Sequence, residues 1–306
     1  MTLRNTYVNL HPSIRLMIVF ALVFIGLFIS QIISGIILYS ATSSEVAVTE
    51  MCIENVNVNL LKIIQVINSL FTFLLPAYVI ALISNPDPVY HLKMRRRPDL
   101  RQTVMTIALI FSGIALINMM AYWNSKLDLP QGMESLEQLM LNMEKSAQQL
   151  QQRMLGVDNI GGLFVNLFVI ALVPAVSEEL LFRGIIQRTI KEWTNNIHVA
   201  IIVTGFLFSF VHFQFFGFLP RMFLGVVFGY LLYWSGSLWV PIIAHFVNNA
   251  LAAIWYFIYF KTNEAAPNPD EFGADPSSIW LYVSIAAFTG IIVWFVRFRN
   301  QRKVGG

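Results

Sequence analysis

Long apolar runs constrain the fold of this chain more than any other feature of its sequence. A helix needs about 20 consecutive apolar residues to cross the hydrocarbon core of a bilayer. Eight runs approach or exceed that length: 14–40, 58–84, 103–123, 161–183, 197–215, 218–235, 238–260 and 278–297. Only 12% of the 306 residues are charged, against about 25% in soluble domains. The sequence therefore predicts an all-α, polytopic integral membrane protein with about eight transmembrane helices.

Lysine and arginine are concentrated in alternate loops, most densely at Lys93–Arg97 and Arg297–Lys303. The loops between them are acidic, as at Glu134, Glu137 and Asp158. Positively charged loops are retained in the cytoplasm, so an even number of spans predicts that both termini are cytoplasmic. The basic runs indicate contacts with lipid headgroups. The expected partners therefore include the lipid bilayer and exclude nucleic acid.

Residues 131–157 differ from the apolar runs on either side. Apolar residues recur there at helical spacing among Glu, Gln and Lys: Met133, Leu136, Leu139, Met140, Met143, Leu150 and Met154. This pattern predicts an extramembrane amphipathic helix. Such a helix could shield the outer mouth of the bundle, lie on the lipid surface or bind a partner; the pattern favours the surface helix.

A polar cluster, Ser177-Glu178-Glu179-Leu180-Leu181-Phe182-Arg183, interrupts the fourth apolar run. An ionisable residue inside the membrane is costly and marks a candidate functional site. If the helix continues through this point, Glu179 and Arg183 are four residues apart and can form an ion pair on one face. Glu178 points about 100° away from that pair and is free to face a polar cavity. The alternative is a single structural salt-bridge cluster at a helix end.

Two histidines follow in later apolar runs. His245 and Asn249 are four residues apart, so they share a helix face and can address the same small volume. Phe208 precedes His212 by the same spacing, which places an aromatic ring beside the imidazole. The ring could form a cavity wall; packing against lipid or within the core is the alternative. Each histidine alone is more typical of a hydrogen-bonded packing residue. Two histidines with an asparagine and a glutamate pair indicate a shared site.

Together these motifs resemble the CPBP/Abi family of intramembrane proteases, which includes CAAX prenyl protease 2 (Rce1-like). Three motifs on successive membrane segments carry the resemblance: Glu178-Glu179-x-x-x-Arg183, Phe208-x-x-x-His212 and His245-x-x-x-Asn249. The stretch Gly236–His245, which leads into the last histidine motif, is also similar. The resemblance covers about residues 160–255 and implies a membrane protease that cleaves a membrane protein or peptide.

The resemblance also implies catalytic roles for Glu178, His212, His245 and Asn249. Glu178 would activate water with the help of His212, while His245 and Asn249 would stabilise the oxyanion. Glu179 and Arg183 would support the site, with Phe208 beside it. These roles are chemically consistent, because amide hydrolysis needs a base and donors aimed at developing negative charge.

Metal dependence stays open at this point. The family is described as metalloproteases, although a metal-free glutamate mechanism has also been argued. Glu178, His212 and His245 could form a His₂Glu zinc site with an open position. The His-Glu-x-x-His helix of many zinc proteases is absent from the sequence. The balance favours a site without an obligatory metal.

The expected organisation has four parts. Residues 1–130 hold the first three transmembrane helices, 131–157 the extramembrane helix, 158–260 the CPBP/CAAX protease-like core, and 261–306 the last loop, final span and basic tail. By family analogy, the expected location is a bacterial plasma (inner) membrane.

Two other classes of protein share some of these features. A non-enzymatic scaffold or a bacteriocin-immunity-type protein of the same family would keep the fold but tolerate loss of Glu178. A transporter would use intramembrane Glu and His as an ion relay. Transporters more often show broken helices in both halves, whereas the polar residues here lie in the C-terminal half.

Overall fold

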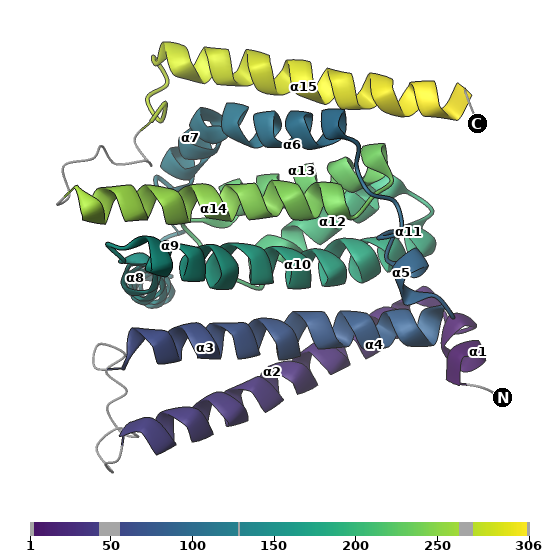
Figure 1. The fold of residues 1–306 in the computed structure, drawn as a ribbon, viewed down its shortest axis with the longest axis horizontal. Coiled ribbons are helices and arrows are strands. Elements are labelled where there is room, and N and C mark those ends of the chain that lie inside the picture. Colours follow the sequence, from purple (N-terminus) through teal and green to yellow (C-terminus); the bar gives the residue numbers. More distant parts are fainter. Residues whose placement is uncertain (1–2, 43–55, 128, 263–271, 305–306) are drawn as a thin grey trace.

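A computed structural model describes residues 3–42, 56–127, 129–262 and 272–304 of the chain. Within those residues every regular element is a helix, which confirms the all-α prediction. The long helices run side by side between two ends of the molecule (Figure 1). The N-terminal helices are α1 (Leu3–Val8), α2 (Pro12–Thr42), α3 (Val58–Ser69), η3 (Leu70–Leu74), α4 (Leu75–Ser84) and α5 (Pro88–His91).

The C-terminal half contains the elements that build the site. They are α9 (Ile160–Asn166), η4 (Leu167–Leu172), α10 (Val173–Glu179), η5 (Leu180–Ile186), α11 (Gln187–Thr194), α12 (Ile197–Phe210), α13 (Phe218–Ser235) and α14 (Trp239–Lys261). The remaining helices are α6 (Leu100–Ser112), α7 (Ile114–Asn124), α8 (Glu134–Leu155) and α15 (Ile279–Val304).

Six described helices are long and apolar enough to cross a membrane: Pro12–Ala41, Val58–Ser84, Ile160–Thr194, Phe218–Ser235, Trp239–Lys261 and Ile279–Gln301. A seventh span forms if α6 and α7, which are bent by 40° relative to each other, count as one. The protein is therefore a polytopic integral membrane protein, but the predicted count of eight is not confirmed. The difference lies in the run 197–215, where the helix ends at Phe210 and is shorter than a full span.

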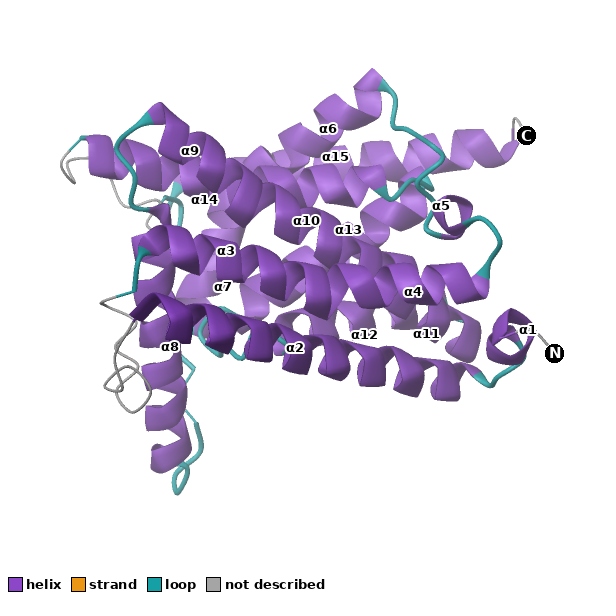
Figure 2. Cartoon of the chain, turned by 60° about the horizontal axis from the view of Figure 1, so that its bottom comes forward, coloured by secondary structure: helices purple, strands orange, loops and turns teal. Residues whose placement is uncertain are grey.

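Both described ends of the chain lie at the same end of the bundle, next to α5 and α11 (Figures 1 and 2). This agrees with an even number of crossings. The membrane side on which that end lies remains a prediction. The predicted last loop falls largely at 263–271, outside the described residues, as do the side chains of the tail after Gln301.

The amphipathic segment predicted at 131–157 forms a helix, α8, over Glu134–Leu155. It lies across the end of the bundle opposite the termini, roughly perpendicular to the long helices (Figure 2). Only its last turn is buried, at Met154 and Leu155. Most of the helix therefore lies outside the packed core, and its extramembrane position remains a proposal.

Three π-helical turns interrupt the long helices in the part of the chain that the structure describes, and two of them flank the polar cluster. η4 ends just before Pro174, and η5 begins just after Glu179. Such turns often occur at functional sites because they rotate the residues that follow relative to a regular α-helix. Here they re-aim the side chains around the two glutamates.

Close backbone contact joins α12 to α13. A Cβ atom on Gly225 would lie 3.0 Å from the Cα atom of Gly205, and one on Gly205 would lie 3.0 Å from the Val226 nitrogen. Small residues let membrane helices approach in this way. The connection between α12 and α13, residues 211–217, lies close to α10 and α14 and lines the same cavity as they do.

Candidate active site

The two adjacent carboxylates face different surroundings, as the helical spacing predicted. Glu179 Oε1 accepts a hydrogen bond from Arg183 Nη1 at 2.8 Å, and both side chains are fully buried. Glu178 points instead to a cavity, and its buried Oε2 has no hydrogen-bond partner in the described part of the chain. Glu179 is therefore tied into the structure through Oε1, although its Oε2 also has no partner in the described chain. What distinguishes Glu178 is that it lines the cavity.

Arg183 is held from three directions. Its Nη2 donates to the Gly225 carbonyl at 2.8 Å. Its guanidinium carbon lies 4.6 Å from the Phe208 ring centre and 5.4 Å from that of Phe228. The ion pair with Glu179, the hydrogen bond to the Gly225 carbonyl and the two aromatic faces together compensate the buried charge of the guanidinium. Arg183 thereby links α10 to α12 and α13.

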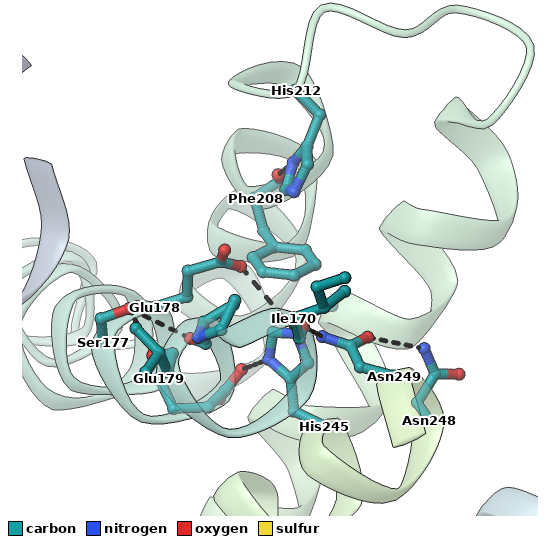
Figure 3. A network of polar contacts seen from close by, with 12 residues as sticks. Ile170, Ser177, Glu178, Glu179, Phe208, His212, His245, Asn248 and Asn249 are labelled. Carbon is teal, nitrogen blue, oxygen red and sulfur yellow. Dashed lines mark hydrogen bonds and ion pairs between the residues drawn. The ribbon is translucent and has the colours of Figure 1, made fainter. Parts of the chain in front are cut away.

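His245 bridges the two glutamates. Its Nδ1 donates to Glu179 Oε1 at 2.9 Å, and its Nε2 lies 4.0 Å from Glu178 Oε2 (Figure 3). The imidazole stacks on Phe228 with ring centres 5.2 Å apart. A hydrogen bond at one ring nitrogen fixes the orientation of the other. The structure thus aims His245 Nε2 at the free carboxylate.

A cavity of about 270 Å³ lies in front of these groups. Its lining includes Glu178, Phe208, His212, Arg221, His245 and Asn249. The motif residues predicted to share a site therefore do lie around one volume. Glu179 and Arg183 lie behind the cavity wall.

His212 lies on the opposite side of Phe208 from His245. Its Nδ1 is 2.7 Å from the Phe208 carbonyl oxygen. The Phe208 ring centre is 5.3 Å from that of His212 and 5.7 Å from that of His245, so the phenyl ring separates the imidazoles (Figure 3). His212 is on the turn after α12, which is why both histidines reach one cavity although straight spans would place them at different depths.

The turn that carries His212 is fixed by α7. Asn124 Nδ2 donates to the Phe215 carbonyl at 2.7 Å, and Asn124 Oδ1 accepts from the Leu219 N–H at 2.8 Å. Asn124 is itself buried. Two hydrogen bonds from one buried amide satisfy backbone groups that the turn leaves without helical partners.

Asn249 has a local structural contact in addition to lining the cavity. Pro174 lacks the N–H that would donate to the Ile170 carbonyl four residues earlier. Asn249 Nδ2 lies 3.4 Å from that oxygen, and Asn248 Nδ2 lies 3.2 Å from Asn249 Oδ1. The amide therefore satisfies a carbonyl that the proline leaves free.

Sequence reasoning missed Arg221. This half-buried arginine, on the first turn of α13, lines the cavity and donates from Nη2 to Gln214 Oε1 at 2.6 Å. Its buried Nη1 has no partner in the described chain. The sequence does show a lone arginine inside an apolar run. Because charge inside a membrane is costly, such a residue is a candidate for a functional site.

The zinc interpretation does not fit this arrangement. No three His, Cys, Asp or Glu side chains are grouped to hold a metal ion among the residues that the structure describes. The Phe208 ring between His212 and His245 gives the physical reason. The expected set of Glu178, His212 and His245 is therefore not assembled as a His₂Glu metal site.

The fold and the site define an integral membrane protein with a buried Glu–His–Arg network inside its helical bundle. Residues 160–251 match the family described as type II CAAX prenyl endopeptidase Rce1-like, which confirms the resemblance. Endopeptidases are hydrolases, so the match supports a hydrolase at the level of the family only. The match includes every motif residue from Glu178 to Asn249.

One curated relative is the "Uncharacterized protein YpbD" of Bacillus subtilis (strain 168). It is 29% identical over 92 residues, which are 29% of this chain and 44% of that protein. The similarity therefore spans less than half of the relative. No solved structure matches the chain.

Proposed function

We propose that this protein is an intramembrane endopeptidase that hydrolyses a peptide bond of a membrane-associated protein or peptide. The observation that carries the proposal is the position of Glu178 Oε2. This oxygen has no hydrogen-bond partner in the described chain and lies 4.0 Å from His245 Nε2, at the cavity that Glu178 lines. That separation is too long for a direct hydrogen bond and suits groups that share a water molecule. A carboxylate placed in this way is a candidate general base.

The proposed reaction starts with a water molecule beside Glu178. The Glu178 carboxylate takes one proton as the water oxygen attacks the carbonyl carbon and the carbonyl electron pair moves onto oxygen. When the tetrahedral intermediate collapses, the C–N bond breaks and the amine nitrogen receives the proton from Glu178. Water thus supplies the hydroxyl of one product and the proton of the other.

Donors around the cavity would stabilise the oxyanion. By family resemblance Asn249 fills this role, as does His245 when Nε2 carries a proton in addition to Nδ1. Arg221 adds a free Nη1. An arginine guanidinium donates but never accepts, so it suits developing negative charge. His212 would assist Glu178 from the far side of Phe208.

The proposed core covers residues 158–260, supported by the helices of residues 1–130 and by the final span. α8 would lie outside the bilayer, over the end opposite the termini. The location would be a bacterial plasma membrane, with cytoplasmic termini. A cavity inside a bundle of spans favours substrates that reach it from the bilayer.

Mass spectrometry of membrane-protein ends tests the proposal. Cells carrying the wild-type protein would be compared with cells carrying Glu178→Gln, which keeps the side-chain shape but removes the base. Glu137→Gln, on exposed α8, is the matched control. We expect new N- and C-termini in the wild type and the control, and none in Glu178→Gln at equal abundance.

The alternative is a scaffold or immunity-type protein of the same family. It predicts identical peptide ends in all three strains and a cellular phenotype that Glu178→Gln retains. That result would remove the peptidase proposal while leaving the family match intact.

A further inference from the structure

A second cavity lies at the end of the bundle that carries the termini. Its volume is about 560 Å³, roughly twice that of the candidate active site. The loop after α5 forms one wall, while η5 and α11 form another. The start of α12 and the end of α13 complete it.

The lining of this cavity is strongly basic. Its charged side chains are Lys93, Arg95, Arg96, Arg183, Arg188, Lys191 and one carboxylate, Glu192. Glu192 already pairs with Arg15 at 2.8 Å and with Arg188 at 3.1 Å. The cavity therefore carries a large excess of positive charge.

Three of these cations have no acidic partner among the described residues. Arg95 pairs with Asp87 and Arg183 with Glu179. Within the described residues no carboxylate lies within 4.0 Å of Lys93, Arg96 or Lys191. Partial burial, together with the positive charges of Arg188 and Lys191, lowers the pKa of Lys93. An anion in the cavity would relieve this repulsion.

Hydrogen bonds from the α13–α14 turn fix the basic loop in place. The Leu238 N–H donates to the Lys93 carbonyl at 3.1 Å, and Trp239 Nε1 donates to the Met94 carbonyl at 2.8 Å. Ser237 Oγ donates to the Arg96 carbonyl. Lys93 itself adopts a left-handed backbone with φ of 57°. The cations are thus held on a preorganised backbone.

The surroundings of the cavity are those of a lipid-facing surface. Its charged lining is interrupted by apolar Leu92, Ile197 and Leu232. Beyond Ile197, α12 exposes Val199, Ile202, Val203 and Phe206 by 38–48%, as expected for a helix that faces acyl chains. We propose that this cavity binds the phosphate group of an anionic phospholipid, with the acyl chains lying against α12. The inference does not depend on the peptidase proposal.

Native mass spectrometry of the purified full chain in neutral detergent tests this site. The probes are phosphatidylglycerol and phosphatidylcholine, with glycerol phosphate as the free-phosphate arm and an acidic peptide as the peptide arm. Lys93→Gln/Lys191→Gln removes two cavity cations. Arg97→Gln/Arg101→Gln removes two exposed cations outside the cavity lining.

We expect the wild type to retain phosphatidylglycerol in preference to phosphatidylcholine. The cavity double variant should bind phosphatidylglycerol roughly 30-fold more weakly, at about 1 kcal/mol per lysine. The control double variant should stay within about twofold of the wild type. An unchanged thermal midpoint without lipid shows that both variants fold.

If both double variants bound phosphatidylglycerol equally weakly, the proposed site would be wrong, because the result would indicate a general attraction between the basic surface and the lipid. If glycerol phosphate bound as tightly as phosphatidylglycerol, the ligand would be a free phosphate and the proposal of a phospholipid would be wrong. Preference for the acidic peptide over both would overturn a phosphate site altogether.

Discussion

Arg183 and Glu178 are both buried, ionisable residues, yet their surroundings assign them different roles. Arg183 compensates Glu179, so Arg183→Met leaves a buried carboxylate without its partner. Removing one member of a buried ion pair costs about 3–5 kcal/mol. Glu178 Oε2 has no hydrogen-bond partner in the described chain, so Glu178→Gln breaks no polar contact closer than the 4.0 Å approach of His245 Nε2.

We therefore expect thermal unfolding in detergent to show a large loss of stability for Arg183→Met. Glu178→Gln should match or exceed the wild-type midpoint while abolishing peptide cleavage. If Glu178→Gln destabilised the protein as much as Arg183→Met, the glutamate would be a structural residue.

Arg221 is proposed to donate a hydrogen bond to the oxyanion, although it belongs to none of the sequence motifs. A donor aimed at an oxyanion is worth about 10² to 10³ in kcat. Arg221→Gln should therefore lower kcat by about that factor with little change in KM, and Arg221→Lys should recover part of the rate. Lys126→Gln, an exposed cation, serves as the control. A change confined to KM would assign Arg221 to substrate binding only.

At the residue scale the sequence predicted the Glu179–Arg183 ion pair, the separate orientation of Glu178 and the shared face of His245 and Asn249. These follow from helical spacing alone. The Glu179–His245 hydrogen bond and the position of Arg221 depend on how distant helices pack, which spacing within one helix does not specify.

The α12–α13 contact is the element on which the site geometry depends. Gly225→Ala would place a Cβ 3.0 Å from Gly205 Cα and 3.2 Å from a Phe208 ring carbon. The helices must separate, which should cost about 1–3 kcal/mol and displace the carbonyl that Arg183 binds. Thermal unfolding and a cleavage assay would measure both effects.

Gly35→Ala is the matched control, since a Cβ there meets no atom within 4 Å. It should leave stability and cleavage near wild-type levels. Equal effects of the two substitutions would show that close α12–α13 contact is not required.

Element boundaries were predictable where hydropathy and helix breakers agree, as at 58–84 and 218–235. The run 197–215 was predicted as one span, but its helix ends at Phe210. Hydropathy does not detect the turn because Phe213, Phe215 and Phe216 keep the segment apolar. The π-helical turns have no pattern in the sequence.

At the scale of the whole molecule, an ion network beside the basic cavity joins α2 to the Rce1-like region. Arg15 of α2 and Arg188 of α11 share Glu192, and Arg188 Nη1 donates to the His91 carbonyl at 3.0 Å. The pKa of His91 is lowered from 6.5 to about 4, mainly by burial and also by the positive charges of Arg188 and Arg15, while Glu192 opposes the shift.

This pKa predicts how stability depends on pH. Between pH 6.5 and about 4 the unfolded chain binds more protons at His91 than the folded protein does. The contribution of neutral His91 to stability is therefore full above pH 6.5 and is lost as the pH falls to about 4. His91→Gln should flatten the decrease in thermal midpoint over this range. An unchanged slope would contradict the assignment.

Hydrolysis by water at Glu178 is tested most directly in a reconstituted system. Membranes from cells carrying Glu178→Gln hold the uncleaved substrates, and purified wild-type protein in proteoliposomes would be added to them in H₂¹⁸O. We predict new peptide C-termini that carry one ¹⁸O with the wild-type protein and none with purified Glu178→Gln. New ends that form equally with both proteins, or with neither, would contradict the proposed peptidase.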